Sequence, residues 1–257
     1  MIYIIVVIFV LVILFYFYKK KNSKPKIQIK EIPEHWHTIL YKNVLFYEKL
    51  SEEDQLYFRK QVQGFLNEVI IEAVEFELEE LDKMLVAASA VIPVFGFENW
   101  KYPNIKTVII YPDYFNDRLE YHKKAKNKNI GGMVGNGPFN NQMILSRRAL
   151  HHGFVNKSDK GNTGIHEFVH LIDKLDGEID GIPKALLSNE NVVLWLDLIH
   201  DKMEAINKDK SDIRNYGGTS RHEFFAVASE YFFERPMLLK RKHPELYKML
   251  SDCFKFV

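Results

Sequence analysis

Two histidines and a glutamate stand at a spacing that can bind a metal ion and activate water. His166 and His170 lie four residues apart in the stretch GIHEFVHLID (164–173), and Glu167 directly follows the first histidine. In a helix, residues four apart project from one face, so both imidazoles can bind a single zinc ion. Glu167 is then placed to take a proton from a water whose pKa the ion lowers. The H-E-x-x-H arrangement predicts a zinc-dependent hydrolase with one Zn²⁺ per chain.

The side chains around these three residues predict that the helix is buried. It also carries five large apolar residues: Ile165, Phe168, Val169, Leu171 and Ile172. Polar side chains without partners cost free energy when they are buried. One metal ion would give all three polar side chains a partner, which favours the zinc interpretation over a chance occurrence of the pattern.

Catalytic zinc sites have three protein ligands, and in a helical metallopeptidase the third often comes from a later helix. The later part of the chain offers several acids and histidines: Glu190, Glu204, Glu223, Glu230, Glu234, His200 and His222. Glu223 is favoured because it lies in the most apolar of the later helices, residues 221–234. An alternative role exists, since Ser220 and Glu223 have the spacing of a capping box. The residues alone leave both roles open.

The remaining patterns predict an α+β domain over residues 46–257, mainly helical with a small mixed sheet. Ser51 followed by acidic residues is typical of a helix N-terminus. A second helix, rich in small side chains, is expected to end before Pro93. Short runs rich in β-branched or apolar residues predict strands within residues 69–76, 107–111 and 142–146.

Two stretches before the predicted metal-binding helix carry separate expectations. Residues 142–146 are expected to form an edge strand, along which an extended peptide could pair. Residues 131–138 are rich in glycine and are predicted to be flexible and turn-rich. They lack the lysine and hydroxyl residue that complete a phosphate-binding loop.

The N-terminal residues predict a membrane anchor. Residues 1–18 contain no charged side chain, and five lysines follow within residues 19–26. Eighteen helical residues span about 27 Å, close to the thickness of the hydrocarbon core. A cleaved signal peptide would instead carry its basic residues before the apolar run. We therefore expect one transmembrane helix over residues 1–18 and a basic linker over residues 19–45. The positive-inside rule predicts a single-pass protein of the inner (cytoplasmic) membrane with its catalytic domain in the cytoplasm.

Composition excludes some other classes of protein. The 257 residues are 47% hydrophobic and 14% aromatic, which is sufficient for a substantial core. Net charge is +1, and without the five N-terminal lysines acidic residues outnumber basic ones, which argues against a nucleic-acid partner. Cys253 is the single cysteine, so the chain has neither an intramolecular disulfide nor a cysteine-based zinc site.

Three segments, IHEFVHLID, DGIP and YGGTSRHEFFAVASEYFFERP, make the chain similar to a known family. It resembles the Mlc titration factor A family of bacterial zinc metallopeptidases, and the HEFxHxxD and YGxT…EFFA pair also resembles the catalytic domain of anthrax lethal factor. The resemblance implies a zincin-type domain in which His166, His170 and Glu223 bind zinc and Glu167 is the general base. By the same resemblance Tyr216 steadies the oxyanion, and Asp173 is a candidate to orient a ligand imidazole.

The resemblance also implies what the domain acts on. It implies aminopeptidase-like hydrolysis of peptide or protein substrates, so a membrane-anchored zinc peptidase is the predicted function. In one branch of the family it implies binding of a transcriptional repressor. The alternative is therefore a regulatory binding protein that sequesters a transcriptional regulator and keeps zinc for structure. Glu167 and Tyr216 favour the enzyme, because a structural zinc site needs neither.

Overall fold

The computed structural model describes residues 31–156 and 159–256. Ile32–Val257 form one compact unit. The predicted transmembrane helix, residues 1–18, lies outside the described residues. Within the described part of the chain, no helix is both long and apolar enough to cross a membrane.

The sheet is small and mixed, which confirms that part of the predicted fold. It contains β1 (Ile70–Ala73), β2 (Thr107–Tyr111), β3 (Gly132–Val134) and β4 (Gln142–Ser146) in the order β1-β2-β4-β3. Strands β1, β2 and β4 run parallel, whereas β3 pairs antiparallel with β4. The predicted strand positions are confirmed for β1, β2 and β4.

The predicted edge position of residues 142–146 is wrong. β4 lies between β2 and β3, so both of its edges are paired. The chain reaches β4 through a tight connection at residues 135–141, where the Gly135 amide donates to the Gln142 carbonyl at 2.8 Å. This connection holds β3 against β4 and makes β3 an edge of the sheet. Part of the glycine-rich stretch that was expected to be flexible is therefore a strand.

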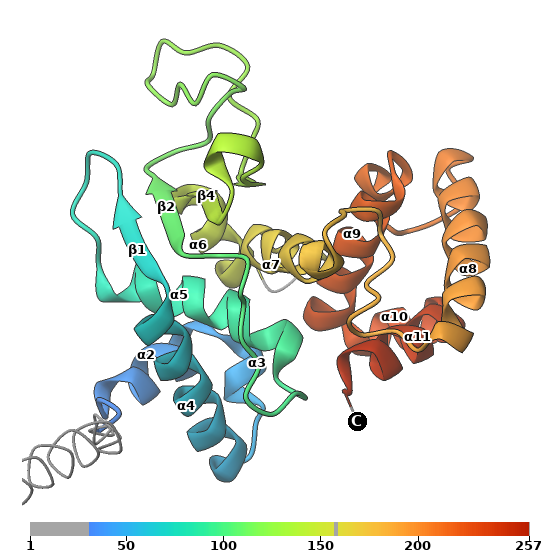
Figure 1. Cartoon of the computed structure of the whole chain (residues 1–257), viewed down its shortest axis with the longest axis horizontal. Coiled ribbons are helices and arrows are strands. Elements are labelled where there is room, and N and C mark those ends of the chain that lie inside the picture. Colours follow the sequence, from blue (N-terminus) through green and yellow to red (C-terminus); the bar gives the residue numbers. More distant parts are fainter. Residues whose placement is uncertain (1–30, 157–158, 257) are drawn as a thin grey trace, which may run out of the picture. The chain divides into compact units, whose positions relative to one another are not determined.

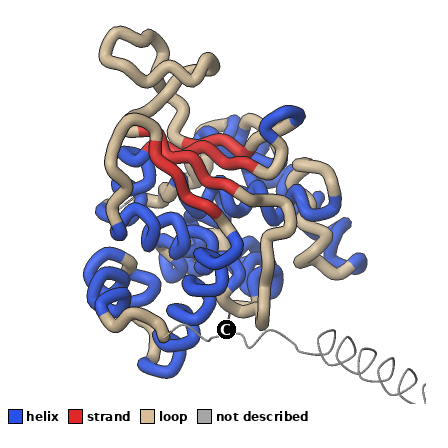
Figure 2. The backbone as a smooth tube through the Cα atoms, turned by 60° about the vertical axis from the view of Figure 1, so that its left-hand side comes forward, coloured by secondary structure: helices blue, strands red, loops and turns tan. Residues whose placement is uncertain are grey.

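One face of the sheet packs on the helices, as Figure 2 shows. Alternate residues of β2, Val108 and Ile110, are fully buried, and Met143 and Leu145 of β4 join them. A strand places successive side chains on opposite faces, so this alternation gives the sheet one core-facing side.

The helix that carries the predicted metal ligands, α7 (Thr163–Asp173), packs on α5 (Glu80–Val91). α5 presents small side chains there, including Ala88 and Ser89, as its composition predicted. A Cβ atom added to Gly164 would lie 2.1 Å from the Ser89 hydroxyl, so only glycine permits this close approach. α4 (Glu52–Glu68) also packs on α5. Its predicted cap is confirmed, because the Ser51 hydroxyl accepts a hydrogen bond from the Asp54 amide.

The C-terminal helices lie on the other side of α7 in Figure 1. α9 (Arg221–Glu234) makes the most extensive contact with α7, and it is followed by α10 (Pro236–Lys242) and α11 (Pro244–Phe254). α8 (Asn189–Asn207) and a short 3-10 turn, η4 (Asn215–Gly218), precede α9 and pack on each other. α6 (Arg147–Val155) joins β4 to the segment before α7.

The compact unit begins earlier than the expected linker end at residue 45. Residues expected in the linker form α2 (His35–Asn43), and α3 (Leu45–Glu48) follows. Leu40 is fully buried, and His37 hydrogen-bonds the Tyr47 hydroxyl at 2.8 Å. These contacts place α2 in the packing of the domain.

Candidate active site

α7 brings the two histidines of the predicted metal site together. The Asn162 side chain caps this helix by accepting from the Ile165 amide, and every residue from Gly164 to Asp173 is buried. His166 and His170 project from the same face, with their Nε2 atoms 3.0 Å apart. The spacing predicted this pairing, and the cap and the buried face of α7 hold it in place.

Glu223 reaches the same point from the first turn of α9. Its Oε2 atom lies 3.0 Å from His166 Nε2 and 3.5 Å from His170 Nε2. The Ser220 hydroxyl does cap α9, but it does so by accepting from the backbone amide of Glu223. The carboxylate of Glu223 faces the histidines and the Tyr216 hydroxyl instead, so it does not complete a capping box.

The geometry of these three side chains fits a metal ion. One ligand atom from each of His166, His170 and Glu223 lies within 4.8 Å of the other two. A tetrahedral zinc ion with ligands at about 2.0–2.1 Å separates neighbouring ligand atoms by about 3.3 Å. Glu223 Oε2 is buried and has no hydrogen bond of good geometry, although two imidazole nitrogens lie near it. A cation bound here would lie against this oxygen and both imidazole nitrogens.

Charge also suits a cation. Burial alone lowers the pKa of His166, but the carboxylates of Glu230 and Glu223 outweigh it and raise the pKa to about 10. Burial lowers the pKa of His170. Burial alone raises the pKa of Glu223, yet the two imidazoles outweigh it and hold that pKa well below its usual range. The site thus concentrates negative charge, and a binding metal ion would displace the proton of His166.

Glu230 orients the first histidine. Its Oε1 atom accepts from His166 Nδ1 at 2.8 Å and also pairs with Arg214. Its Oε2 atom accepts from the Asn162 amide. A carboxylate on the far nitrogen of a ligand histidine fixes the tautomer that leaves Nε2 free for metal. Glu230 lies two helical turns after Glu223 and therefore on the same face of α9. Sequence spacing alone could not tell which of the two acids binds the metal and which one orients the histidine.

Asp173, expected to orient a ligand imidazole, has a different partner. Its Oδ2 atom accepts from the Gly181 amide at 2.8 Å, and the Gly181 carbonyl accepts from Trp195 Nε1 at 2.7 Å. Asp173 therefore fastens the DGIP turn to α7 and, through Trp195, to α8. Among the described contacts, the hydrogen bond that orients a candidate ligand histidine comes from Glu230.

Glu167 lies between α7 and the edge strand β3. Its side chain is buried, with 6% of the residue exposed, and the backbone amide of Val134 in β3 lies near its carboxylate. Burial raises the pKa of Glu167 to about 7, against the lowering effect of His166. A general base works best when its pKa lies near the working pH.

Gly132 makes room for this carboxylate. A Cβ atom added at this position would lie 2.6 Å from Glu167 Cγ and 2.7 Å from its Oε1. The sequence alone gives no sign of this role, because two adjacent glycines, Gly131 and Gly132, are typical of a turn.

We expect Gly132→Ala to displace the Glu167 carboxylate and to lower turnover with peptide substrates by about tenfold or more, since catalytic groups tolerate little misplacement. Metal content should not change, because Gly132 contacts none of the three ligand atoms. The control is Gly64→Ala in α4, where an added Cβ meets nothing within 4 Å. Full activity in Gly132→Ala would show that catalysis by Glu167 does not require a glycine at position 132.

Tyr216 lies at the exposed side of the site. Its hydroxyl donates to Glu223 Oε1 at 2.9 Å, and its ring lies 6.0 Å from that of His166. The residue is 52% exposed, so this side of the site is open to solvent. Burial, together with the charge of Glu223, raises the pKa of Tyr216 and keeps the phenol protonated.

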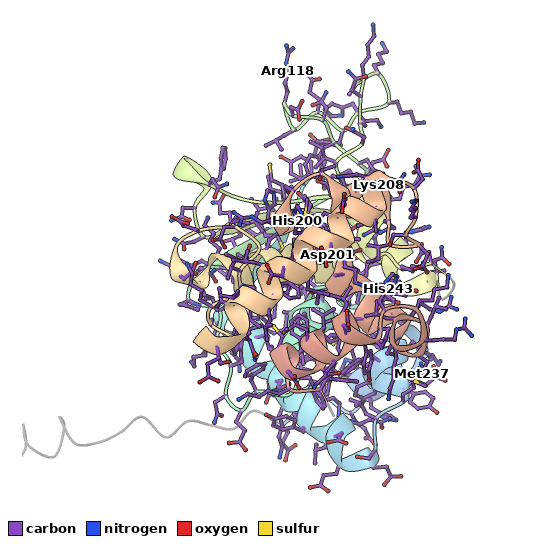
Figure 3. All side chains as sticks on the ribbon, turned by 90° about the vertical axis from the view of Figure 1, so that its right-hand side faces the viewer. Arg118, His200, Asp201, Lys208, Met237 and His243 are labelled. Atoms are coloured by element: carbon purple, nitrogen blue, oxygen red, sulfur yellow. The ribbon has the colours of Figure 1, made fainter. Side chains whose placement is uncertain are left out.

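The other candidate ligands lie elsewhere. His200 is exposed on the outer surface of α8, where Figure 3 labels it beside Asp201, and Glu190 and Glu204 are exposed on the same helix. Glu234 accepts from Asn162 Nδ2 at 3.0 Å. His222 comes closest, with its ring 5.7 Å from that of His170, but none of its atoms joins the three-ligand cluster.

Residues 17–255 match the family described as glucose-regulated metallo-peptidase M90. The chain belongs to this family. The match spans nearly all of the described residues and includes every residue of the site. Membership confirms the resemblance drawn from the motifs, supports a metallopeptidase-type protein, and implies a divalent metal ion.

Individual relatives agree with the family. Over 245 residues the chain is 26% identical to Mlc titration factor A of Pectobacterium atrosepticum, covering 91% of this chain and 89% of that protein. It is 27% identical to Mlc titration factor A of Cronobacter sakazakii over 220 residues, with 80% of each chain covered. An uncharacterised Synechocystis protein is 27% identical over 240 residues, with coverage of 88% and 85%.

Proposed function

We propose that this chain is a zinc-dependent peptidase with aminopeptidase-like action, in which His166, His170 and Glu223 hold the metal and Glu167 is the general base. The observation that carries the proposal is the convergence of these three ligand atoms within 4.8 Å of one another. Glu167 stands next to the cluster and Tyr216 at its exposed side. A structural metal site would need neither of these two groups.

The chain's own residues transfer the proton and stabilise the charge that develops. A zinc ion, when bound, supplies Lewis-acid activation of the water and the scissile carbonyl. Glu167 removes the proton from the attacking water and passes it to the leaving amine. The Tyr216 hydroxyl, protonated and accessible, donates a hydrogen bond to the oxygen on which negative charge develops. Glu230 and Arg214 keep His166 in one orientation throughout.

The edge strand β3 offers a place for an extended peptide. Its pairing with β4 leaves its other edge without a neighbouring strand in the described sheet. A peptide can add to such an edge through backbone hydrogen bonds. Because Gly132 of β3 packs so closely on the Glu167 side chain that a Cβ atom would not fit, β3 lies directly beside the proposed general base.

The test of the proposal combines metal analysis with substrate cleavage. Purified protein should contain about one zinc per chain, and a peptide library should be cleaved in a manner that a chelator abolishes and added zinc restores. Products should show which end of the peptide is attacked, since aminopeptidase-like action releases N-terminal residues. A folded preparation that binds no zinc, or cleavage unaffected by chelation, would contradict the proposal.

Tyr216→Phe should lower kcat by on the order of a hundredfold, because the hydroxyl contributes mainly once negative charge develops on the oxyanion. KM should change less than kcat, and zinc content should remain at the wild-type level. Tyr41→Phe is the control, since Tyr41 is also about half exposed but belongs to α2. Unchanged kcat in Tyr216→Phe would remove Tyr216 from the mechanism.

A second candidate function is a regulatory binding protein. The relatives of Pectobacterium and Cronobacter are named Mlc titration factor A. We extend to this chain the alternative that it sequesters a transcriptional regulator and keeps zinc for structure. The two functions differ in their dependence on Glu167, because binding of a regulator would survive loss of the general base whereas hydrolysis would not.

For localisation, we propose a single-pass anchor over residues 1–18 in the inner membrane, with the catalytic domain in the cytoplasm. The charge-free run and the lysines after it motivate the proposal. Protease added to intact cells should therefore leave the domain whole, and it should degrade the domain once the cells are opened. Degradation in intact cells would show the opposite orientation, and recovery of the protein in the soluble fraction would show that residues 1–18 do not anchor it.

A further inference from the structure

A cavity of about 160 Å³ lies behind the metal-binding helix. Ile165 of α7 lines it, next to the first proposed ligand. The rest of its wall comes mainly from α3 and the residues beside it, α6, α9 and the C-terminus, together with Ile92 and Pro236. Most of these side chains are apolar, including Leu45, Phe154, Phe232 and Phe256. Only two charged side chains, Lys49 and Glu234, reach this wall.

The cavity suits an apolar molecule better than water. A buried water needs two to four polar partners, and a largely apolar wall offers few. A cavity of about 150 Å³ lined by leucine, isoleucine and phenylalanine can hold a benzene ring. The space therefore matches a body of about six or seven carbon atoms.

Glu234 adds a specific hydrogen-bond acceptor. Its Oε1 atom accepts from Asn162 Nδ2 at 3.0 Å. The other carboxylate oxygen, Oε2, has no hydrogen-bond donor among the described residues. A ligand that donates one hydrogen bond could therefore occupy this oxygen without breaking the bond to Asn162, and the cap of α7 would stay intact.

Neighbouring charges favour a cationic donor at this oxygen. Burial raises the pKa of Glu234 to about 7, and the carboxylates of Asp159 and Glu230 add to the rise, while Lys49 partly offsets it. Glu230 is itself paired with His166 and Arg214, so the negative charge that a ligand would meet in this wall is that of Glu234, with Lys49 as the one cation in the wall. An ammonium group would pair with the ionised Glu234 carboxylate, whereas a second carboxylate would be repelled by it.

We propose that this cavity is a binding site for a small apolar amine, whose hydrocarbon body fills the space between α3, α7 and α9 and whose ammonium group donates to Glu234. The site is distinct from the proposed metal centre, because none of the three clustered ligands lines this cavity. Binding requires no hydrolysis, so this inference stands or falls independently of the proposed function.

The test uses benzylamine as the probe on the full-length protein at pH 8, above the pKa of Glu234. Calorimetry or ligand-observed NMR should show saturable binding of one molecule per chain. Glu234→Gln should weaken this binding at least tenfold. The amide removes the charge but keeps an oxygen to accept from Asn162, so the thermal midpoint should stay near that of the wild type.

Three comparisons make the result specific. Glu245→Gln makes the same chemical change at an exposed acid of α11 and should leave benzylamine binding unchanged. Toluene lacks the amine, so it should bind the wild type more weakly than benzylamine and should not distinguish Glu234→Gln from the wild type. Equal benzylamine affinity in the wild type and Glu234→Gln would overturn the proposal, since binding would then occur elsewhere, such as at the metal. Binding that does not saturate would also overturn it.

Discussion

Replacing Glu167 by Gln is expected to lower peptide hydrolysis by about a hundredfold to ten-thousandfold, while zinc remains bound. The amide has nearly the shape of the carboxylate and fits the same space beside Gly132 of β3. It has no basic oxygen with which to take a proton, and general acid–base catalysis contributes about that factor. Glu167 supplies none of the three clustered ligand atoms, so metal affinity should not fall.

The measurement is kcat on a peptide substrate together with zinc content for wild type and variant. Glu190→Gln, at an exposed position in α8, is the matched control and should behave as the wild type. Hydrolysis at the wild-type rate in Glu167→Gln would assign the activity to a contaminant or another site. If a regulator still binds this inactive variant, binding is independent of catalysis, and the second candidate function gains support.

Glu223→Ala is expected to weaken zinc binding by more than a hundredfold and to abolish hydrolysis. Loss of an outer partner of a ligand typically costs about 10–100-fold in metal affinity, and loss of a ligand should cost more. The fold should survive, because the Ser220 cap of α9 uses the backbone amide of residue 223, which alanine retains. Loss of a capping role alone would cost about 1 kcal/mol of stability and leave zinc bound.

Glu230→Gln is the informative comparison for this prediction. Glu230 contacts His166 on the nitrogen opposite the proposed metal, at 2.8 Å, so its replacement should weaken zinc binding by about 10–100-fold and no more. Zinc titrations against a competing chelator would rank the three proteins. Full zinc occupancy in Glu223→Ala would exclude Glu223 as the third ligand. A larger loss of zinc affinity in Glu230→Gln than in Glu223→Ala would make Glu230 the ligand and Glu223 the orienting residue.

Local sequence determined much of the framework. The apolar residues around His166 and His170 make α7 bury its whole length, and the four-residue spacing places both imidazoles on one face. The strands β1, β2 and β4 were predictable because β-branched and apolar residues dominate them. Ser51 and Ser220 each begin a helix by a side-chain cap that needs only neighbouring residues.

The tertiary structure decided the features that depend on distant partners. β3 has only three residues and begins with glycine, so it is a strand because β4 supplies its hydrogen bonds. For the same reason β3, and not the predicted β4, forms an edge of the sheet. The compact unit also begins at Ile32 and not at the predicted residue 46. The burial of Leu40 depends on contacts with the folded domain, which an isolated α2 would lack.

The candidate site shows the same division. Sequence spacing and the family resemblance together selected His166, Glu167, His170 and Glu223. Distinct roles for Glu223 and Glu230 came only from the fold, since the two acids lie seven residues apart and face the same side of α9. The packing of α9 on α7 brings one carboxylate to the Nε2 side of His166 and the other to its Nδ1 side. Such a difference depends on the position of one helix against another, which no local pattern in the chain encodes.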